Sequence, residues 1–257
     1  MLTIQPICAF SDNYIWLIFD QDSRQAFVVD PGDATPVLAA LRAQQLDLAG
    51  ILITHHHFDH VGGLEQLCAA FNPVVYGPRN PAISGLSQTL GAGDQIEVLG
   101  DEFSILEVPG HTLDHIAYFH RGEEPVLFCG DTLFAGGCGR VFEGSYEMMH
   151  KSLQKLAALS PQTQVFCAHE YTMANLAFAR AVSPEFQPLA ERIVLEQGKR
   201  DQALATVPTS IKKELGTNPF LRCDDEHVRL SAEQKVSSSL DNPEQVFAVL
   251  REWKDSF

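Results

Sequence analysis

The sequence predicts an α/β (α+β) domain followed by a smaller domain made of helices, and three observations lead to this fold class. Segments with the character of strands alternate with helical segments up to His169. Short strands separated by turn residues, a pattern typical of antiparallel neighbours, follow one another between residues 95 and 129. After His169 only helical patterns appear. We therefore predict a catalytic domain over residues 1–172 and a helical, substrate-binding domain over residues 173–257.

The elements of the first domain can be justified in chain order. Short apolar runs bounded by turn residues predict strands, and apolar residues at helical spacing predict helices. The predicted strands are 14–19, 26–29, 51–53, 74–76, 95–98, 103–108, 116–120, 126–129 and 164–167, with a loop over 77–93. The predicted helices are 36–45, 61–71 and 145–159, the last with Ser145 as its N-cap. In the second domain we expect helices over 171–181, 188–205 and 243–254, and no strand.

The composition narrows the class of partner. A formal net charge of −15 argues against nucleic acid, since phosphate binding needs clustered Lys and Arg.

The N-terminus lacks the basic and apolar parts of a signal peptide, and no apolar run is long enough to span a membrane. None of the six cysteines forms a Cys-x-x-Cys pair. We therefore expect a cytoplasmic protein with reduced thiols, and a monomer by default.

The stretch from Thr54 to His60 carries the strongest chemical signal. It has the form His-x-His-x-Asp-His, with candidate metal ligands at His55, His57, Asp59 and His60. Imidazole and carboxylate groups suit zinc and similar divalent ions. The adjacent Asp59 and His60 should not share the geometry of the first two ligands, which suggests two neighbouring metal positions. The alternative is a polar surface loop with an accidental run of histidines, and four ligands within six residues argue against it.

Three more candidate ligands each follow an apolar strand. His111, Asp131 and His169 come just after the predicted strands that end at residues 108, 129 and 167. Each one alone is as often structural as functional. Together with the first cluster they complete two sets of three ligands, plus one residue to bridge them. Loops carried by a rigid sheet are a common place for such residues.

These motifs resemble those of the metallo-β-lactamase superfamily, and the chain is more closely similar to its glyoxalase II, or hydroxyacylglutathione hydrolase, family. The resemblance covers essentially the whole length. The motifs that carry it are 12–14, 30–32, 54–63, 109–112, 130–134, 136–140, 142–144, 169–172, 218–222 and 254–257. The segments from Gly136 onward and the helical C-terminal part point to glyoxalase II within the superfamily.

The resemblance implies an αβ/βα four-layer sandwich that binds two divalent metal ions per chain, with zinc favoured and iron or manganese as alternatives. It assigns His55, His57 and His111 to one ion, Asp59, His60 and His169 to the other, and Asp131 to both as a bridge. One departure lies beside these ligands. Asp114 stands where the family's motif usually has Gly, although His115 is kept.

The implied reaction is the hydrolysis of S-(2-hydroxyacyl)glutathione, such as S-D-lactoylglutathione, to glutathione and a 2-hydroxy acid, the second step of methylglyoxal detoxification. The nucleophile is the metal-bridging hydroxide, with Asp59 as its proton acceptor. The implied glutathione contacts are Arg140, Phe142, Tyr171, Arg251 and Lys254. Phe142 stands where some members have a Tyr, so its contact lacks a hydroxyl. By spacing alone, Arg251 and Lys254 would be ordinary solvated charges on one helix face.

Three other functions use the same scaffold. One is a nuclease, and the acidic charge argues against it. Persulfide dioxygenases share most of these ligands but use one iron, and they generally lack a long helical C-terminal part. A non-catalytic module would have lost ligands, whereas all seven are present here.

Several histidines and cysteines are left over. We expect His56 to be structural or exposed, and His115 to be either an orienting residue or a core histidine. We expect His120, His150 and His227 on the surface, and Cys129 and Cys167 to be buried thiols.

Overall fold

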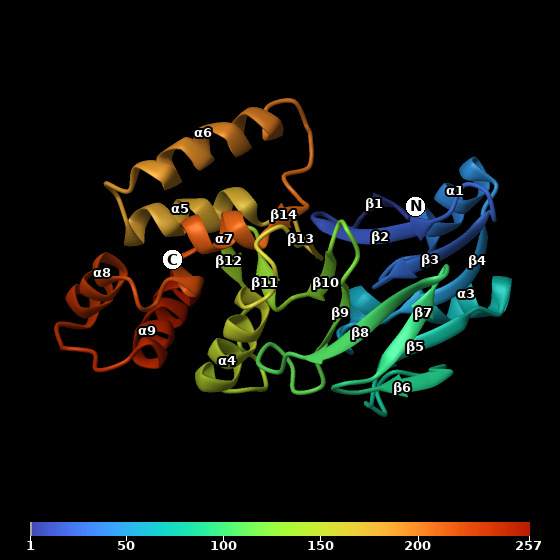
Figure 1. Ribbon diagram of the computed structural model, residues 1–257, viewed down its shortest axis with the longest axis horizontal. Helices are drawn as coiled ribbons and strands as arrows, with labels where there is room; N and C mark the ends of the chain where they lie inside the picture. The colour runs from blue at the N-terminus through green and yellow to red at the C-terminus, as the bar shows by residue number, and fades with distance from the viewer. Residues whose placement is uncertain (1) are drawn as a thin grey trace. The chain divides into compact units, whose positions relative to one another are not determined.

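The computed structural model describes residues 2–257, and the chain divides into two compact units (Figure 1). Unit 1 is formed by Met1–Glu107 and Asp114–Gly130, and unit 2 by Val108–Leu113 and Asp131–Phe257. This division differs from the boundary expected at residue 172, because strands and helices from the middle of the chain group with the C-terminal helices. The domain boundary drawn from the sequence stays a prediction.

The first sheet of unit 1 begins antiparallel and continues parallel. Neighbours from β1 to β3 pair antiparallel, and neighbours from β3 to β6 pair parallel. The strands are β1 (Thr3–Ala9), β2 (Asn13–Phe19), β3 (Gln25–Val29), β4 (Asp47–Leu52), β5 (Val74–Pro78) and β6 (Gln88–Leu90). β6 lies in the stretch predicted as a loop, and its three residues are too few to give a strand signal.

Helices form the crossovers of two of the three parallel pairs, β3 to β4 and β4 to β5. α1 (Ala34–Gln44) begins after Asp33, whose side chain accepts a hydrogen bond from the Thr35 amide at 2.8 Å. The helix predicted over 61–71 is split into α2 (Phe58–Val61) and α3 (Leu64–Phe71). Gly63 lies at the break, where a Cβ atom would be 2.5 Å from the Pro31 carbonyl oxygen. The chain therefore approaches β3 too closely there for any residue except glycine.

The antiparallel run predicted in the middle of the chain is confirmed in unit 1. Consecutive strands pair in the order β7, β8, β9, β10, which are Gln95–Val98, Asp101–Glu107, Ile116–His120 and Val126–Gly130. Tyr118 of β9 is fully buried, and its hydroxyl donates to the carbonyl oxygens of Ile53 at 2.8 Å and Tyr76 at 3.3 Å. These strands thus face the first sheet, and the ligand loop after β4 starts at this contact.

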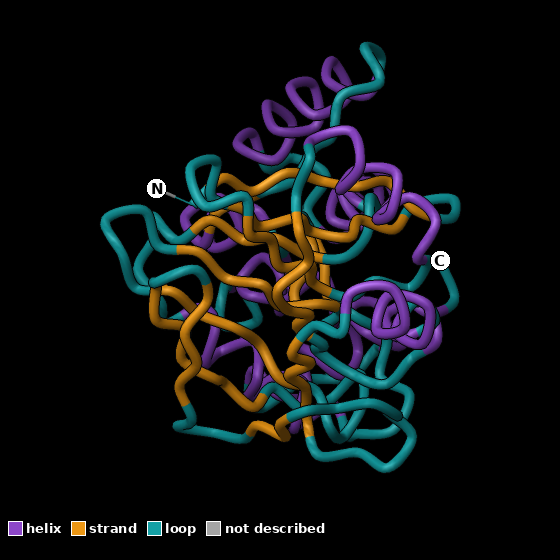
Figure 2. The backbone as a smooth tube through the Cα atoms, turned by 90° about the vertical axis from the view of Figure 1, so that its right-hand side faces the viewer, coloured by secondary structure: helices purple, strands orange, loops and turns teal. Residues whose placement is uncertain are grey.

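Unit 2 is mainly helical, and the chain ends just after a helix (Figure 2). Its elements are β11 (Leu133–Phe134), β12 (Gly137–Cys138), α4 (Tyr146–Ala157), β13 (Gln164–Cys167), α5 (Thr172–Val182), α6 (Gln187–Arg200), β14 (Thr209–Ser210), α7 (Ile211–Thr217), the 3₁₀ turn η1 (Pro219–Leu221), α8 (Glu226–Val236) and α9 (Pro243–Asp255). Ser145 caps α4 as predicted. The sequence missed α7, α8, η1, β11, β12 and β14, which are short or bury few apolar residues.

Over residues 2–257, no helix combines the length and the apolar character that crossing a bilayer demands.

A buried polar network holds the hairpin of β11 and β12, which leads from Asp131 toward Arg140. Glu214 of α7 is fully buried, and its carboxylate accepts from the Gly136 amide at 2.8 Å and from Arg192 at 2.6 Å. The Asn218 side-chain amide donates to the Gly137 carbonyl oxygen at 2.9 Å. Because the buried carboxylate is paired and hydrogen-bonded, this network fixes the hairpin.

Candidate functional site

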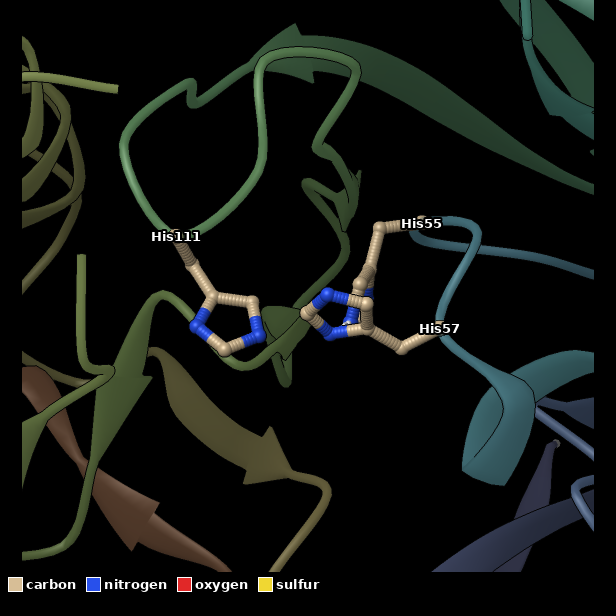
Figure 3. Close-up of side chains that lie close together, drawn as sticks. All are labelled: His55, His57 and His111. Atoms are coloured by element: carbon tan, nitrogen blue, oxygen red, sulfur yellow. Dashed lines mark hydrogen bonds between the residues drawn. The ribbon is translucent and has the colours of Figure 1, made fainter. Parts of the chain in front are cut away.

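The loop between β4 and α2 brings two imidazoles together in unit 1. The distance from His55 Nε2 to His57 Nδ1 is 3.1 Å, and the rings meet edge to face (Figure 3). Two nitrogen ligands of one tetrahedral zinc ion lie about 3.3 Å apart, given a bond length near 2.05 Å. The spacing of these two nitrogens therefore fits a shared metal ion.

The next two candidate ligands, in the first turn of α2, are also close together. His60 Nε2 lies 3.5 Å from Asp59 Oδ2. The same carboxylate oxygen accepts a hydrogen bond from the Asn13 side-chain amide at 2.9 Å. His60 is buried, whereas the Asp59 side chain is 39% exposed. Unit 1 thus presents two ligand pairs from a single loop, and they adjoin each other, since the His55 and His60 ring centroids are 4.0 Å apart.

In unit 2 the two carboxylate oxygens of Asp131 face two different histidines. Asp131 Oδ2 lies 3.4 Å from His111 Nε2, and Asp131 Oδ1 lies 3.3 Å from His169 Nε2. All three residues are buried. Because each of its oxygens faces a different imidazole, this carboxylate could hold a divalent ion together with either histidine.

The distances between these nitrogen and oxygen atoms are longer than hydrogen bonds and closer to the distances between two ligand atoms of one metal ion. Charge-assisted hydrogen bonds between nitrogen and carboxylate oxygen are about 2.7–2.9 Å long. The three pairs that include a carboxylate lie between 3.3 and 3.5 Å. Imidazole nitrogens and carboxylate oxygens are the donor types that zinc, iron and manganese accept. The residues of each unit therefore fit divalent metal ions.

Asp30, at the end of β3, orients two of the ligands and was given no role by the sequence. Its Oδ2 lies 3.0 Å from His60 Nδ1 and accepts from the Thr54 hydroxyl at 2.7 Å. The Thr54 hydroxyl oxygen is in turn 3.0 Å from His55 Nδ1. Such partners fix the tautomer and the ring orientation of metal-binding histidines. The signal was the Asp-Pro-Gly turn directly after a strand.

His111 is oriented by the backbone of the segment that leads to Arg140. Its Nδ1 lies 2.7 Å from the Arg140 carbonyl oxygen. A carbonyl oxygen can only accept, so Nδ1 carries the proton and Nε2 presents its lone pair toward Asp131. This tautomer is the one that a metal ligand at Nε2 requires.

The two histidines left open by the sequence both support the ligand loop of unit 1. His115 is buried and stacks on the His55 ring at 4.6 Å, with its Nδ1 at 3.1 Å from the Ile116 carbonyl oxygen. His56 Nδ1 lies 3.0 Å from Asp114, whose other oxygen accepts from the Asn80 side chain. Asp114, the departure from the family motif, therefore anchors the loop through His56.

The remaining histidines and cysteines follow the predictions with one exception. His227 is exposed, His120 is half-buried, and Cys129 and Cys167 are fully buried thiols. His150 was expected on the surface, and this was wrong. It is buried at 5.5 Å from the Phe247 ring of α9, and burial lowers its pKa. Its helical neighbours gave no sign that α9 covers this face of α4.

Three of the predicted substrate contacts lie beside ligands of unit 2. The Phe142 ring meets the His111 ring edge-on at 5.3 Å, and the Arg140 guanidinium lies 5.5 Å from the Phe142 centroid. Tyr171 stacks on His169 at 4.6 Å with an interplanar angle of 3°. Phe142 and Tyr171 remain exposed in spite of these contacts.

The two cations of α9 are not the solvated charges that their spacing suggests. Arg251 is 5% exposed and donates through Nη1 to the Cys138 carbonyl oxygen at 2.9 Å. Its Nε and Nη2 donate to Asp255 Oδ1 at 3.1 and 2.8 Å. Lys254 is half-buried, and burial, followed by the charge of Arg251, lowers its pKa. Their contact with substrate stays a prediction.

Two family models together match nearly the whole chain. Residues 10–169 match the model described as the metallo-beta-lactamase superfamily, and residues 170–257 match the one described as the hydroxyacylglutathione hydrolase C-terminus. The first match covers more than half of the chain. Both were expected from the motifs.

Relatives with the same description match over their full length. A hydroxyacylglutathione hydrolase of Pseudomonas paraeruginosa is 52% identical over 258 residues, covering 100% of both chains. One of Nitrosomonas eutropha is 48% identical over 259 residues, again covering 100% of both. Two solved structures share the fold. ETHE1 from Myxococcus xanthus has a TM-score of 0.65 at 24% identity, covering 100% of this chain and 99% of its own. The BLEG-1 B3 metallo-beta-lactamase has a TM-score of 0.63 at 23% identity, covering 86% and 99%.

Proposed function

This chain belongs to the hydroxyacylglutathione hydrolase family of the metallo-beta-lactamase superfamily, and we propose that it hydrolyses S-(2-hydroxyacyl)glutathione, with S-D-lactoylglutathione as the substrate of choice. The observation that carries the proposal is 52% identity to a curated hydrolase over the full length of both chains. The match of residues 170–257 to the family's C-terminal model adds the part in which the substrate contacts on α9 lie. Water adds to the thioester carbonyl, the carbon–sulfur bond breaks, and glutathione and a 2-hydroxy acid are released.

The proposed metal centre uses the seven candidate ligands. Candidate metal-binding groups among the described residues support it, since His55, His57 and His111 make up one such group (drawn in Figure 3). Asp59, His60 and His169 make up a second, and a third contains Asp131. One ion would then have Asp131 Oδ2 beside His111, and the other would have Oδ1 beside His169. Zinc is favoured, with iron or manganese as alternatives.

When bound, two divalent ions would supply a water of lowered pKa and a Lewis acid for the carbonyl oxygen. The protein's own part is to keep the ligands in place and to manage the proton. Asp59 is the proposed acceptor of the proton from the attacking water, since its side chain is 39% exposed and Asn13 holds one of its oxygens at 2.9 Å. Asp30 keeps His60 and Thr54 oriented and takes no proton in this proposal.

Substrate selection is proposed to come from the cations and aromatic rings of unit 2. Glutathione carries two carboxylates, and an acidic chain must provide local positive charge to hold them. Arg140, Arg251 and Lys254 provide this charge. Phe142 and Tyr171 pack on the ligands His111 and His169, so they would border the reacting thioester. Phe142 contributes an apolar surface without a hydroxyl.

The test of the function is the oxygen dependence of the reaction, combined with a metal count. The purified protein should hydrolyse S-D-lactoylglutathione equally well with and without oxygen, at two metal ions per chain. A persulfide dioxygenase with a single iron would instead consume oxygen with glutathione persulfide and leave the thioester intact. Absence of thioester hydrolysis in the metal-loaded protein would reject the proposal.

A further inference from the structure

The carboxylate of Asp255, the last residue of α9, uses its two oxygens for different tasks. Oδ1 receives both the Nε and the Nη2 donors of Arg251, at 3.1 and 2.8 Å. Oδ2 faces the Nε atom of Arg140 at the longer distance of 3.8 Å. Arg251 is buried, whereas the Arg140 side chain is 59% exposed. The first contact is therefore a fixed anchor, and the second is a loose ion pair in contact with solvent.

The group formed by Arg140, Arg251, Lys254 and Asp255, which we call the α9 charge cluster, has an excess of positive charge. Arg251 is further held by the carbonyl oxygens of Cys138 and Gly139. The Lys254 ammonium lies 5.8 Å from the Phe178 ring centroid, and none of the described carboxylates comes within ion-pair distance of it. An anion that enters the cluster therefore meets Lys254 and Arg140, while Arg251 stays engaged with Asp255.

We propose that Asp255 determines specificity as an internal competitor for the substrate's carboxylate. Its Oδ1 holds Arg251 in place, and its Oδ2 faces Arg140 until a glutathione carboxylate replaces it there. This inference rests on the proposed function and deepens it. The exposed Arg140 side chain would follow the incoming anion because its present ion pair is long and solvent-exposed, and such pairs contribute little stability. The competition weakens the binding of any small anion that offers only one contact, so it favours a substrate with several.

The Asp255→Asn variant separates the two tasks. The amide oxygen can still accept the two Arg251 donors that now meet on Oδ1, whereas an uncharged NH₂ group would face Arg140. We expect KM for S-D-lactoylglutathione to fall about two- to fivefold at low ionic strength, with kcat unchanged, as the loss of one exposed charge pair allows. The difference should shrink as salt is added. The N-acetylcysteamine thioester of lactate, which lacks the glutathione carboxylates, should keep its KM.

Two further variants control for general charge and for folding. Glu252→Gln removes the same charge from an exposed residue of the same helix and should leave KM unchanged. Asp255→Ala removes the contacts with both Arg251 and Arg140, so it should lower the melting temperature and raise KM. An unchanged or raised KM in Asp255→Asn, or an equal fall in Glu252→Gln, would overturn the proposal.

Failure of the proposed function would look different. In that case the wild type would hydrolyse neither thioester. The binding of S-methylglutathione, measured by calorimetry, would then decide the role of Asp255. Tighter binding to Asp255→Asn than to wild type would support the competition, and equal or weaker binding would reject it.

Discussion

The ligand loops and the α9 charge cluster are built in opposite ways. Each ligand loop holds its side chains through close polar partners, such as Asp30 at 3.0 Å from His60 and the Arg140 carbonyl oxygen at 2.7 Å from His111. The α9 charge cluster joins residues more than a hundred positions apart, and part of it is exposed. The rigid region suits chemistry, which needs fixed geometry. The looser region suits the selection of substrate, so the two should separate into effects on kcat and on KM.

The largest effect should come from the carboxylate that links the ligand set. Asp131→Asn replaces one of the two oxygens that face His111 and His169 with an amide nitrogen, which cannot bind a metal ion. We expect kcat to fall by more than about a hundredfold, beyond the range for a residue that only orients ligands, and bound metal to drop below two per chain. His169→Asn should cost less. Full activity with two ions retained would contradict the bridging role.

Removing an orienting partner should have the next largest effect. Asp30→Asn keeps the shape but removes the charge that faces His60 Nδ1. We expect the metal affinity to weaken about 10–100-fold, with a smaller loss of kcat once excess metal is supplied. Competition with a chelating dye would measure the affinity. Asn80→Ala is the control, because the Asn80 side chain bonds Asp114 and the Ala82 amide but no candidate ligand. An affinity as low as that of Asp30→Asn would show that any change near the loop has this effect.

Substitutions in the α9 charge cluster should change KM. Lys254→Ala breaks no ion pair among residues 2–257, so it should affect only substrate binding. We expect KM for S-D-lactoylglutathione to rise about tenfold with kcat nearly unchanged, because a charge-assisted contact of about 1.5 kcal/mol is lost. Arg251→Ala should also lower the melting temperature, because it strands Asp255 and the Cys138 carbonyl oxygen. Equal losses for the uncharged N-acetylcysteamine thioester would show that α9 supports the fold and does not select substrate.

A smaller, pH-dependent effect should come from His150, which lies against α9. Burial lowers its pKa below the ordinary 6.5, so the folded protein favours the neutral ring while the unfolded chain binds a proton more readily. The stability that this contributes is present above pH 6.5 and is lost as the pH falls below it. His150→Gln should therefore show a shallower fall of melting temperature between pH 7.5 and 5.5, by about 2 °C or less. Parallel curves for both proteins would contradict this.

The smallest effect is expected from reduction. All six cysteines are thiols rather than disulfides, and the buried Cys167 has its pKa raised to about 12. A reducing agent should therefore leave the melting temperature and the activity of both regions unchanged. A clear loss of either would show that a disulfide forms in the working protein and that the cytoplasmic expectation is wrong.

The contrast between the two regions also explains what the sequence could predict. The seven candidate ligands could be predicted because each lies in a short motif next to a strand, where residue type and spacing are visible. Asp30 and Asp255 were missed as functional residues because their roles depend on which side chain the fold places opposite them. The α9 cations carried a local signal for solvated charges, and only tertiary packing buries Arg251. The helices α7 and α8 were not predicted because α7 is short and α8 buries few apolar residues, so neither gave a helical pattern.

The most direct test of the binuclear account is a zinc titration of the metal-free protein, with bound metal and S-D-lactoylglutathione hydrolysis measured at each point. If Asp131 shares its oxygens between two ions, activity should stay low while the first equivalent binds and rise to its maximum as the second binds. Full activity at one ion per chain, with no change on further binding, would contradict a centre in which both ligand sets take part in the reaction.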